Sequence, residues 1–176
     1  RAMTHQERVS LTIAGFESAM ERFLARVTSL SEAEGTRVPP NGGWSAAGVT
    51  WHVAVTNEGF TTLVDGSRPL AREPEPDFVE TPFSEIIAQV PDRLEAPEVF
   101  HPPADLTMAQ ALERLHASRT VFVDAYRALP EARGFWTVKS ILGLITVYQV
   151  GEWAIAHIAR HNAQAKRVLS QVTPAL

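Results

Sequence analysis

The stretch WAIAHIARHNAQ, residues 153–164, has the apolar spacing of a buried helix but carries two histidines, His157 and His161. Residues four positions apart lie on the same face of a helix. Apolar residues recur here at three- and four-residue steps, and continuing those steps from Val150 and Ala154 leads to both histidines. The pair is therefore predicted to point into the protein, where an unpartnered polar group costs roughly 1–3 kcal/mol.

A third histidine occupies a similar position earlier in the chain. In WSAAGVTWHVAV, residues 44–55, Ser45 is a preferred N-cap and His52 falls on the inward stripe of the helix that follows. Neutral imidazole is the commonest metal ligand, and helical bundles build sites from facing helices. His52, His157 and His161 are thus predicted to hold a divalent metal ion with one position open for water or substrate. The alternative is three packed core histidines, each satisfied by hydrogen bonds.

The other three histidines are given structural roles. His5 lies near the terminus, His101 lies in a proline-rich loop, and His116 is one position off the apolar stripe of its helix. The predicted metal site is therefore limited to three ligands.

Apolar periodicity predicts four long amphipathic helices, at residues 5–32, 45–65, 107–129 and 146–169. The third and fourth helices open with the capping-box spacing, Thr107 with Gln110 and Thr146 with Gln149. Helices of this length with one apolar face indicate an all-α fold, and four of them indicate a four-helix bundle. The whole chain, residues 1–176, is predicted to form one domain of this kind.

A long connection separates the second and third helices. From Gly66 to Asp105 the chain is rich in proline and acidic residues, with a short helix predicted around FSEIIAQV, residues 83–90. Loops of this length are uncommon inside compact domains and are often functional. A connection this long lets the second and third helices run parallel, which predicts up-down-down-up topology.

Composition excludes several classes of protein. The net charge of -4 gives no basic footprint, so nucleic acid is not an expected partner. The chain has no cysteine, which rules out disulfides, thiolate metal ligands and a cysteine nucleophile. The most apolar run, residues 141–159, is interrupted by Gln149, Glu152 and His157, so a buried helix is expected rather than a membrane span. The expected location is cytoplasmic.

Two sequence blocks resemble the signatures of the DinB/YfiT-like superfamily. WSAAGVTWHVA resembles its second-helix signature, in which a Trp-Ser pair caps the helix and a histidine follows about two turns later. HIARHNAQ resembles its fourth-helix signature, His-x-x-x-His with a glutamine three residues on. The matching positions are Trp44, Ser45, His52, His157, His161 and Gln164. With the four helices, the resemblance covers nearly the whole chain.

The resemblance implies an up-down-down-up bundle whose three matched histidines bind a divalent metal. Zinc or nickel is expected first, with iron or manganese as alternatives. Relatives often form homodimers, and some are thiol-dependent transferases or isomerases that use a low-molecular-weight thiol.

The sequence therefore predicts a metal-dependent transferase or hydrolase that acts on a small-molecule substrate. The ion would activate water or a low-molecular-weight thiol, which must be external because the chain has no cysteine. Four residues near the histidines along their helices are candidates to orient the ligands: Glu58, Gln149, Glu152 and Gln164. No catalytic acid or base is identified. The alternative from another class is a non-catalytic bundle that binds small molecules or responds to stress.

Overall fold

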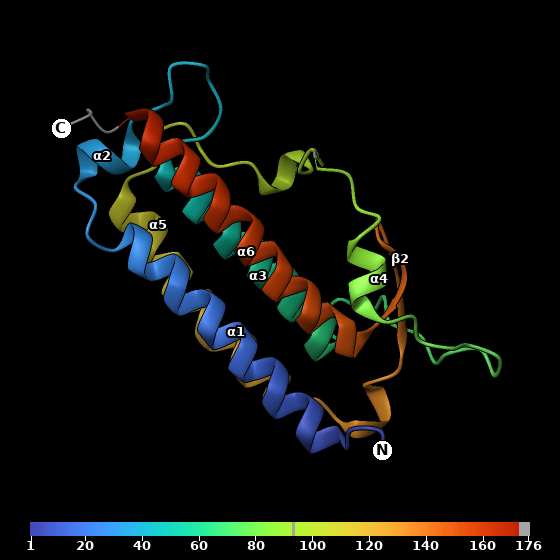
Figure 1. Cartoon of the computed structure of the whole chain (residues 1–176). Coiled ribbons are helices and arrows are strands. Elements are labelled where there is room, and N and C mark those ends of the chain that lie inside the picture. The colour runs from blue at the N-terminus through green and yellow to red at the C-terminus, as the bar shows by residue number, and fades with distance from the viewer. Residues whose placement is uncertain (93, 173–176) are drawn as a thin grey trace.

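The computed structural model describes residues 1–92 and 94–172 and is mostly helical (Figure 1). The helices are α1 (His5–Val27), α2 (Glu32–Thr36), α3 (Ala46–Asp65), α4 (Phe83–Ile87), α5 (Met108–Arg127) and α6 (Val147–Val172), and the strands are β1 (Thr137–Ser140) and β2 (Gly143–Thr146). Two further segments, Glu98–Phe100 (η1) and Glu131–Arg133 (η2), are single 3₁₀ turns.

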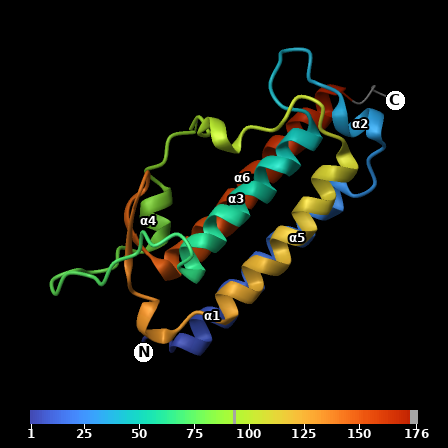
Figure 2. The same cartoon turned by 180° about the vertical axis from the view of Figure 1, so that it is seen from behind.

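The four long helices lie side by side, two in each direction (Figures 1 and 2). α1 and α6 run the same way, because His5 meets Tyr148 near their starts and Arg26, near the end of α1, meets Asn162 farther along α6. α3 and α5 both start beside α2 and run the opposite way. The carboxylate of Glu32 in α2 accepts hydrogen bonds from the first backbone N–H groups of α5 and so caps that helix.

Capping residues fix the helix ends. Ser45 caps α3 as predicted, and the predicted box of Thr107 with Gln110 caps α5. The first helix is shorter than predicted, because it ends at Val27 and a new capping box at Ser31 starts α2. The last helix is longer than predicted, since it continues to Val172.

A β-hairpin precedes α6, and the sequence analysis did not predict it. Its strands pair antiparallel from Thr137 opposite Thr146 to Ser140 opposite Gly143. Gly143 has a φ of 90°, which an L side chain rarely adopts, so the tight turn needs glycine there. Val138 and Ile145 are buried in the main hydrophobic core. The mostly helical fold thus includes a small sheet that contributes to its core.

The helices enclose one hydrophobic cluster. Phe16 of α1 stacks on Phe122 of α5 with ring centroids 4.1 Å apart, and both are fully buried. Gly151 of α6 lies against Tyr126, where an added Cβ would approach the ring to 2.6 Å. Over residues 1–92 and 94–172, no helix combines the length and the apolar character needed to cross a membrane.

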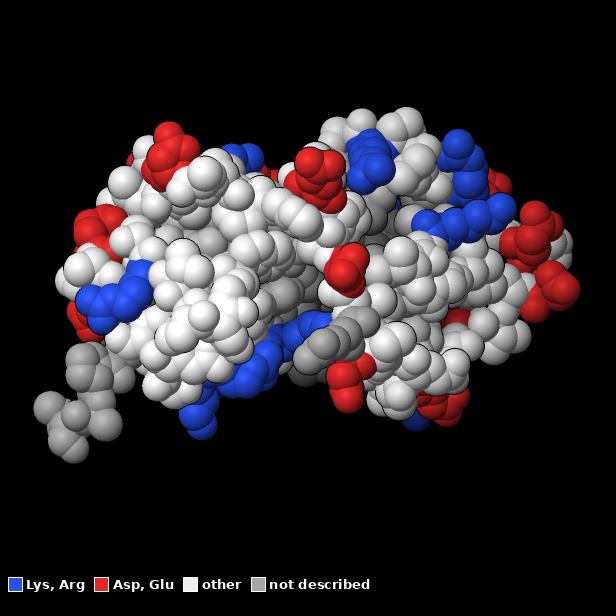
Figure 3. All heavy atoms as spheres, turned by 90° about the horizontal axis from the view of Figure 1, so that it is seen from above, with Lys and Arg blue, Asp and Glu red and all other residues white. Residues whose placement is uncertain are grey.

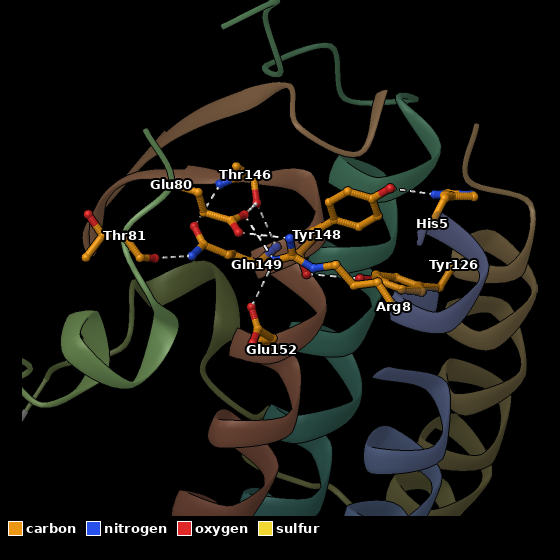
Figure 4. A network of polar contacts seen from close by, with 9 residues as sticks. All are labelled: His5, Arg8, Glu80, Thr81, Tyr126, Thr146, Tyr148, Gln149 and Glu152. Atoms are coloured by element: carbon orange, nitrogen blue, oxygen red, sulfur yellow. Dashed lines mark hydrogen bonds and ion pairs between the residues drawn. The ribbon is translucent and has the colours of Figure 1, made fainter. Parts of the chain in front are cut away.

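The crossover, residues 66–107, passes from the end of α3 to the start of α5 and is tied to the bundle by the Arg8 network: Arg8, Glu80, Thr146 and Glu152 (Figure 4). The Arg8 guanidinium donates to both oxygens of Glu80 at 2.8 and 3.0 Å, and to Glu152 at 3.4 Å. The Thr146 hydroxyl also donates to Glu80. Four charged or polar groups from three parts of the chain thus satisfy one another.

Aromatic and imidazole groups continue this network at the same end of the bundle (Figure 4). The Arg8 guanidinium lies over the Tyr148 ring, 4.4 Å from its centroid. The buried Tyr126 hydroxyl donates to the backbone carbonyl of Tyr148 at 2.9 Å. His5 contacts the Tyr148 hydroxyl at 2.5 Å and the carbonyl of Leu129 at 3.0 Å. His5 therefore has a structural role at the junction of α1, α5 and α6.

Candidate metal centre

Three histidines from two antiparallel helices meet inside the bundle. One ring nitrogen from each of His52, His157 and His161 lies within 4.8 Å of the others. Ring centroids are 5.0 Å apart for His52 and His157, 4.4 Å for His52 and His161, and 4.3 Å for the two rings on α6. His52 is 3% exposed and His161 is 9% exposed. We call these three residues the triad.

Hydrogen bonds orient two of the three rings. Nδ1 of His52 lies 3.0 Å from the carbonyl oxygen of Phe100, and Nδ1 of His161 lies 2.6 Å from Oε1 of Gln164. Because both contacts are to oxygen acceptors, each Nδ1 carries the proton and donates. Nε2 of each ring then has a free lone pair, which is the form that binds a metal.

The geometry and donor set fit a divalent ion. Nε2 of His52 lies 3.1 Å from Nε2 of His157. Two nitrogens at zinc distance, each about 2.0–2.1 Å from a tetrahedral ion, are about 3.3–3.4 Å apart. Nδ1 of His157 is buried and has no hydrogen-bond partner among the described residues. The hydrogen bonds of the described residues therefore leave one polar atom of the triad without a partner.

Burial keeps the imidazoles neutral. It lowers the pKa of His161 to about 3, with further lowering by the neighbouring His52. It lowers the pKa of His157 well below the usual value, and repulsion from the other two rings, whenever they are protonated, adds to the effect. Burial also lowers the pKa of His52, although its hydrogen bond to Phe100 opposes the shift. Neutral rings are the form that coordinates metal near neutral pH.

The four residues expected to orient the ligands are placed differently. Gln164 contacts His161 directly. The other three have partners elsewhere: Gln149 donates to the carbonyl of Thr81, Glu152 pairs with Arg8, and Glu58 pairs with Arg114. No described hydrogen bond joins any of these three to the triad.

Sequence reasoning did not place three other groups at the site: the carbonyl of Phe100, His101 and the ring of Trp44, which was named only as part of a helix cap. The acceptor for His52 is the backbone carbonyl of Phe100, and a backbone oxygen leaves no signal in residue type. The Trp44 ring lies 4.8 Å from the His52 ring, and His101 lies edge-on to Trp44 at 5.7 Å. The Trp-Ser pair before α3 was a usable signal for Trp44. His101, given a structural role, lies near the triad in the crossover.

Helices that converge on three neutral imidazoles define a helical protein with a candidate metal centre. The model of the DinB superfamily matches residues 16–165, a span that includes all three histidines. The chain belongs to the DinB superfamily, as the two sequence blocks predicted. No curated protein and no solved structure matched the chain.

Proposed function

We propose that this protein is a metal-dependent enzyme that holds one divalent ion on His52, His157 and His161. The observation that carries the proposal is the convergence of three neutral imidazoles, two of them with Nδ1 bound to an oxygen acceptor. Membership of the DinB superfamily supports it. The helix directions described above support an up-down-down-up four-helix bundle as the scaffold.

The chain's own residues hold and orient the ligands. His157 and His161 lie one turn apart on α6, and His52 faces them from α3, so an ion would join the two helices. Gln164 and the carbonyl of Phe100 fix which nitrogen of each ring is protonated. A bound divalent ion supplies Lewis-acid activation of water or a thiol. Any thiol comes from a small cosubstrate, because the sequence contains no cysteine.

Substrate class and assembly extend this proposal. We expect a small-molecule substrate and a bound zinc or nickel ion, with iron or manganese as alternatives. We also expect the chain to form one domain, to assemble as a homodimer and to be cytoplasmic. The rival is a non-catalytic bundle, in which His157 donates to His52 across the 3.1 Å contact. Nδ1 of His157 has no partner among the described residues in either arrangement, so the convergence of all three rings is what favours the metal-binding alternative.

Elemental analysis tests the metal. Tag-free protein incubated with zinc and freed of excess should hold one ion per chain, and a variant with His52, His157 and His161 all changed to alanine should hold none. A screen for thiol transfer and for hydrolysis with the loaded protein then tests the activity. Equal metal content in the wild type and the triple variant would overturn the site.

A further inference from the structure

Two basic side chains, Arg160 and Arg167, lie beside the triad on α6. On α6, Arg160 is three residues past His157, Gln164 is three residues past His161, and Arg167 is three residues past Gln164. Positions three and four residues apart are neighbours on a helix surface. Arg160 and Arg167 thus stand along one side of the histidine stripe.

The two arginines act on the triad through their charge. Arg160 donates to the backbone carbonyl of Asp92 at 2.7 Å, which holds its guanidinium between α6 and the crossover. Its positive charge contributes to the low pKa of His157 and of His161, and Arg167 contributes to that of His161. No ion pair joins either arginine to a carboxylate in the described part of the chain.

The described acidic groups near the site form no ion pair with either arginine. Glu58 and Glu152 are paired with arginines elsewhere, and Asp92 and Glu98 of the crossover are exposed to solvent. The charges that perturb the three histidines all come from histidines and arginines. Figure 3 shows a hollow near the middle of the face in view, with Lys and Arg side chains on one side of it and Asp or Glu side chains also at its border.

A divalent ion on three neutral ligands would add two positive charges to this environment. Like charges in a partly buried site repel, so the site is more stable when an anion enters. We propose that the ligand of this site is a small organic anion, whose acidic group lies against Arg160 and Arg167 while its other end reaches the triad. This inference rests on the proposed metal-dependent function.

Three thiols of similar size and different charge test the inference. The probes are 3-mercaptopropionate (negative), 2-mercaptoethanol (neutral) and cysteamine (positive), each titrated calorimetrically into the zinc-loaded full chain. We expect 3-mercaptopropionate to bind at least tenfold more tightly than 2-mercaptoethanol, and cysteamine to bind most weakly. The preference should fall with rising salt, because surface charges are screened.

Two variants and a control identify the charges responsible. Arg167→Gln and Arg160→Gln should each reduce the preference for 3-mercaptopropionate at least threefold. Arg167→Gln is the cleaner variant, since Arg160 also holds the crossover. Lys166 lies nine residues after His157, which is two and a half helical turns, so it is on the opposite side of α6. Lys166→Gln removes one positive charge there and should leave the preference for 3-mercaptopropionate unchanged.

The outcomes separate the two proposals. If wild-type protein takes up no zinc, the proposed function is wrong and the inference falls with it. If zinc binds but the three thiols bind equally, only the inference is overturned. An equal loss in Lys166→Gln and Arg167→Gln would also overturn it, because net charge rather than local position would then set the preference.

Discussion

Two polar clusters lie among these helices, and they differ in how fully their polar atoms find partners within the chain. In the Arg8 network, an arginine meets two carboxylates, and a hydroxyl donates to one of those carboxylates, so opposite charges and donors are matched. In the triad, three neutral rings meet one another, and Nδ1 of His157 has no described partner. The comparison suggests that the first cluster serves structure, whereas the second keeps ligand capacity for something outside the chain.

The largest expected effect tests the structural side of this comparison. Arg8→Met leaves Glu80 and Glu152 facing each other without a cation, and the Arg8 and Glu80 side chains are only 15% and 20% exposed. We expect unfolding free energy to fall by about 3 kcal/mol, the lower end for breaking a buried pair. Urea unfolding measures it. Arg1→Met, at an exposed pair, should leave the unfolding free energy almost unchanged, because solvent screens the attraction. Equal costs in both variants would contradict the distinction.

Metal addition tests the other cluster. A ligand that binds only the folded state, at a hundredfold excess over its dissociation constant, stabilises it by about 2.7 kcal/mol. Zinc or nickel added to chelator-treated protein should therefore raise the melting temperature by roughly 5–10 °C in a thermal-shift assay. His161→Ala should lose most of this rise, and Arg8→Met should keep it, because the two clusters are independent. An unchanged melting temperature across the titration would refute the metal site.

Acidification should weaken the metal-free protein through the triad. Because the pKa of His161 is lowered to about 3 in the folded state, the unfolded chain binds more protons below about pH 6.5. Between pH 7 and pH 5 this histidine alone should cost about 2 kcal/mol of unfolding free energy. Burial raises the pKa of Glu152, which opposes the trend at the other cluster.

Chelator-treated protein unfolded in urea at pH 7 and at pH 5 measures this loss. His161→Asn should reduce the pH dependence, and Glu152→Gln should slightly increase the loss on acidification. Stability that is constant or rises toward pH 5 would show that the triad is not held neutral.

The smallest expected effect separates a residue that contacts the triad from one that does not. Gln164→Leu removes the oxygen that accepts a hydrogen bond from Nδ1 of His161, so the dissociation constant for zinc should rise about tenfold. Glu58→Gln alters an exposed pair with Arg114 and should change zinc affinity less than twofold. Competition with a chromophoric chelator gives both constants. Similar losses in the two variants would mean that Gln164 has no special role.

Local patterns in the sequence predicted much of the fold and the triad. Helical periodicity places His157 and His161 on the inward face because that face is continuous from Val150 onward. Capping residues predicted the starts of α3 and α5 because a side-chain oxygen next to an apolar run acts locally.

Two features were not predicted, one local and one that depends on a distant contact. Residues 141–146 were included in an apolar run, although β-branched neighbours and Gly143 favour the hairpin that forms there. Glu152 was placed near the triad by its position on the helix, but Arg8 comes from α1, 144 residues away. Sequence spacing along one helix cannot show which side chain another element brings to it.

The parallel packing of α1 against α6, the first and last helices, affects the order in which the chain folds. α1 meets α6 only when the ends of the chain come together, since His5 and Tyr148 are 143 residues apart. Loop-closure entropy makes such contacts slow to form. We expect α3 and α5 to associate early and α6 to dock last. His52 and His157 are 105 residues apart, so His52 meets the two rings of α6 only at that final step. A metal ion would then act as a reporter of completed folding.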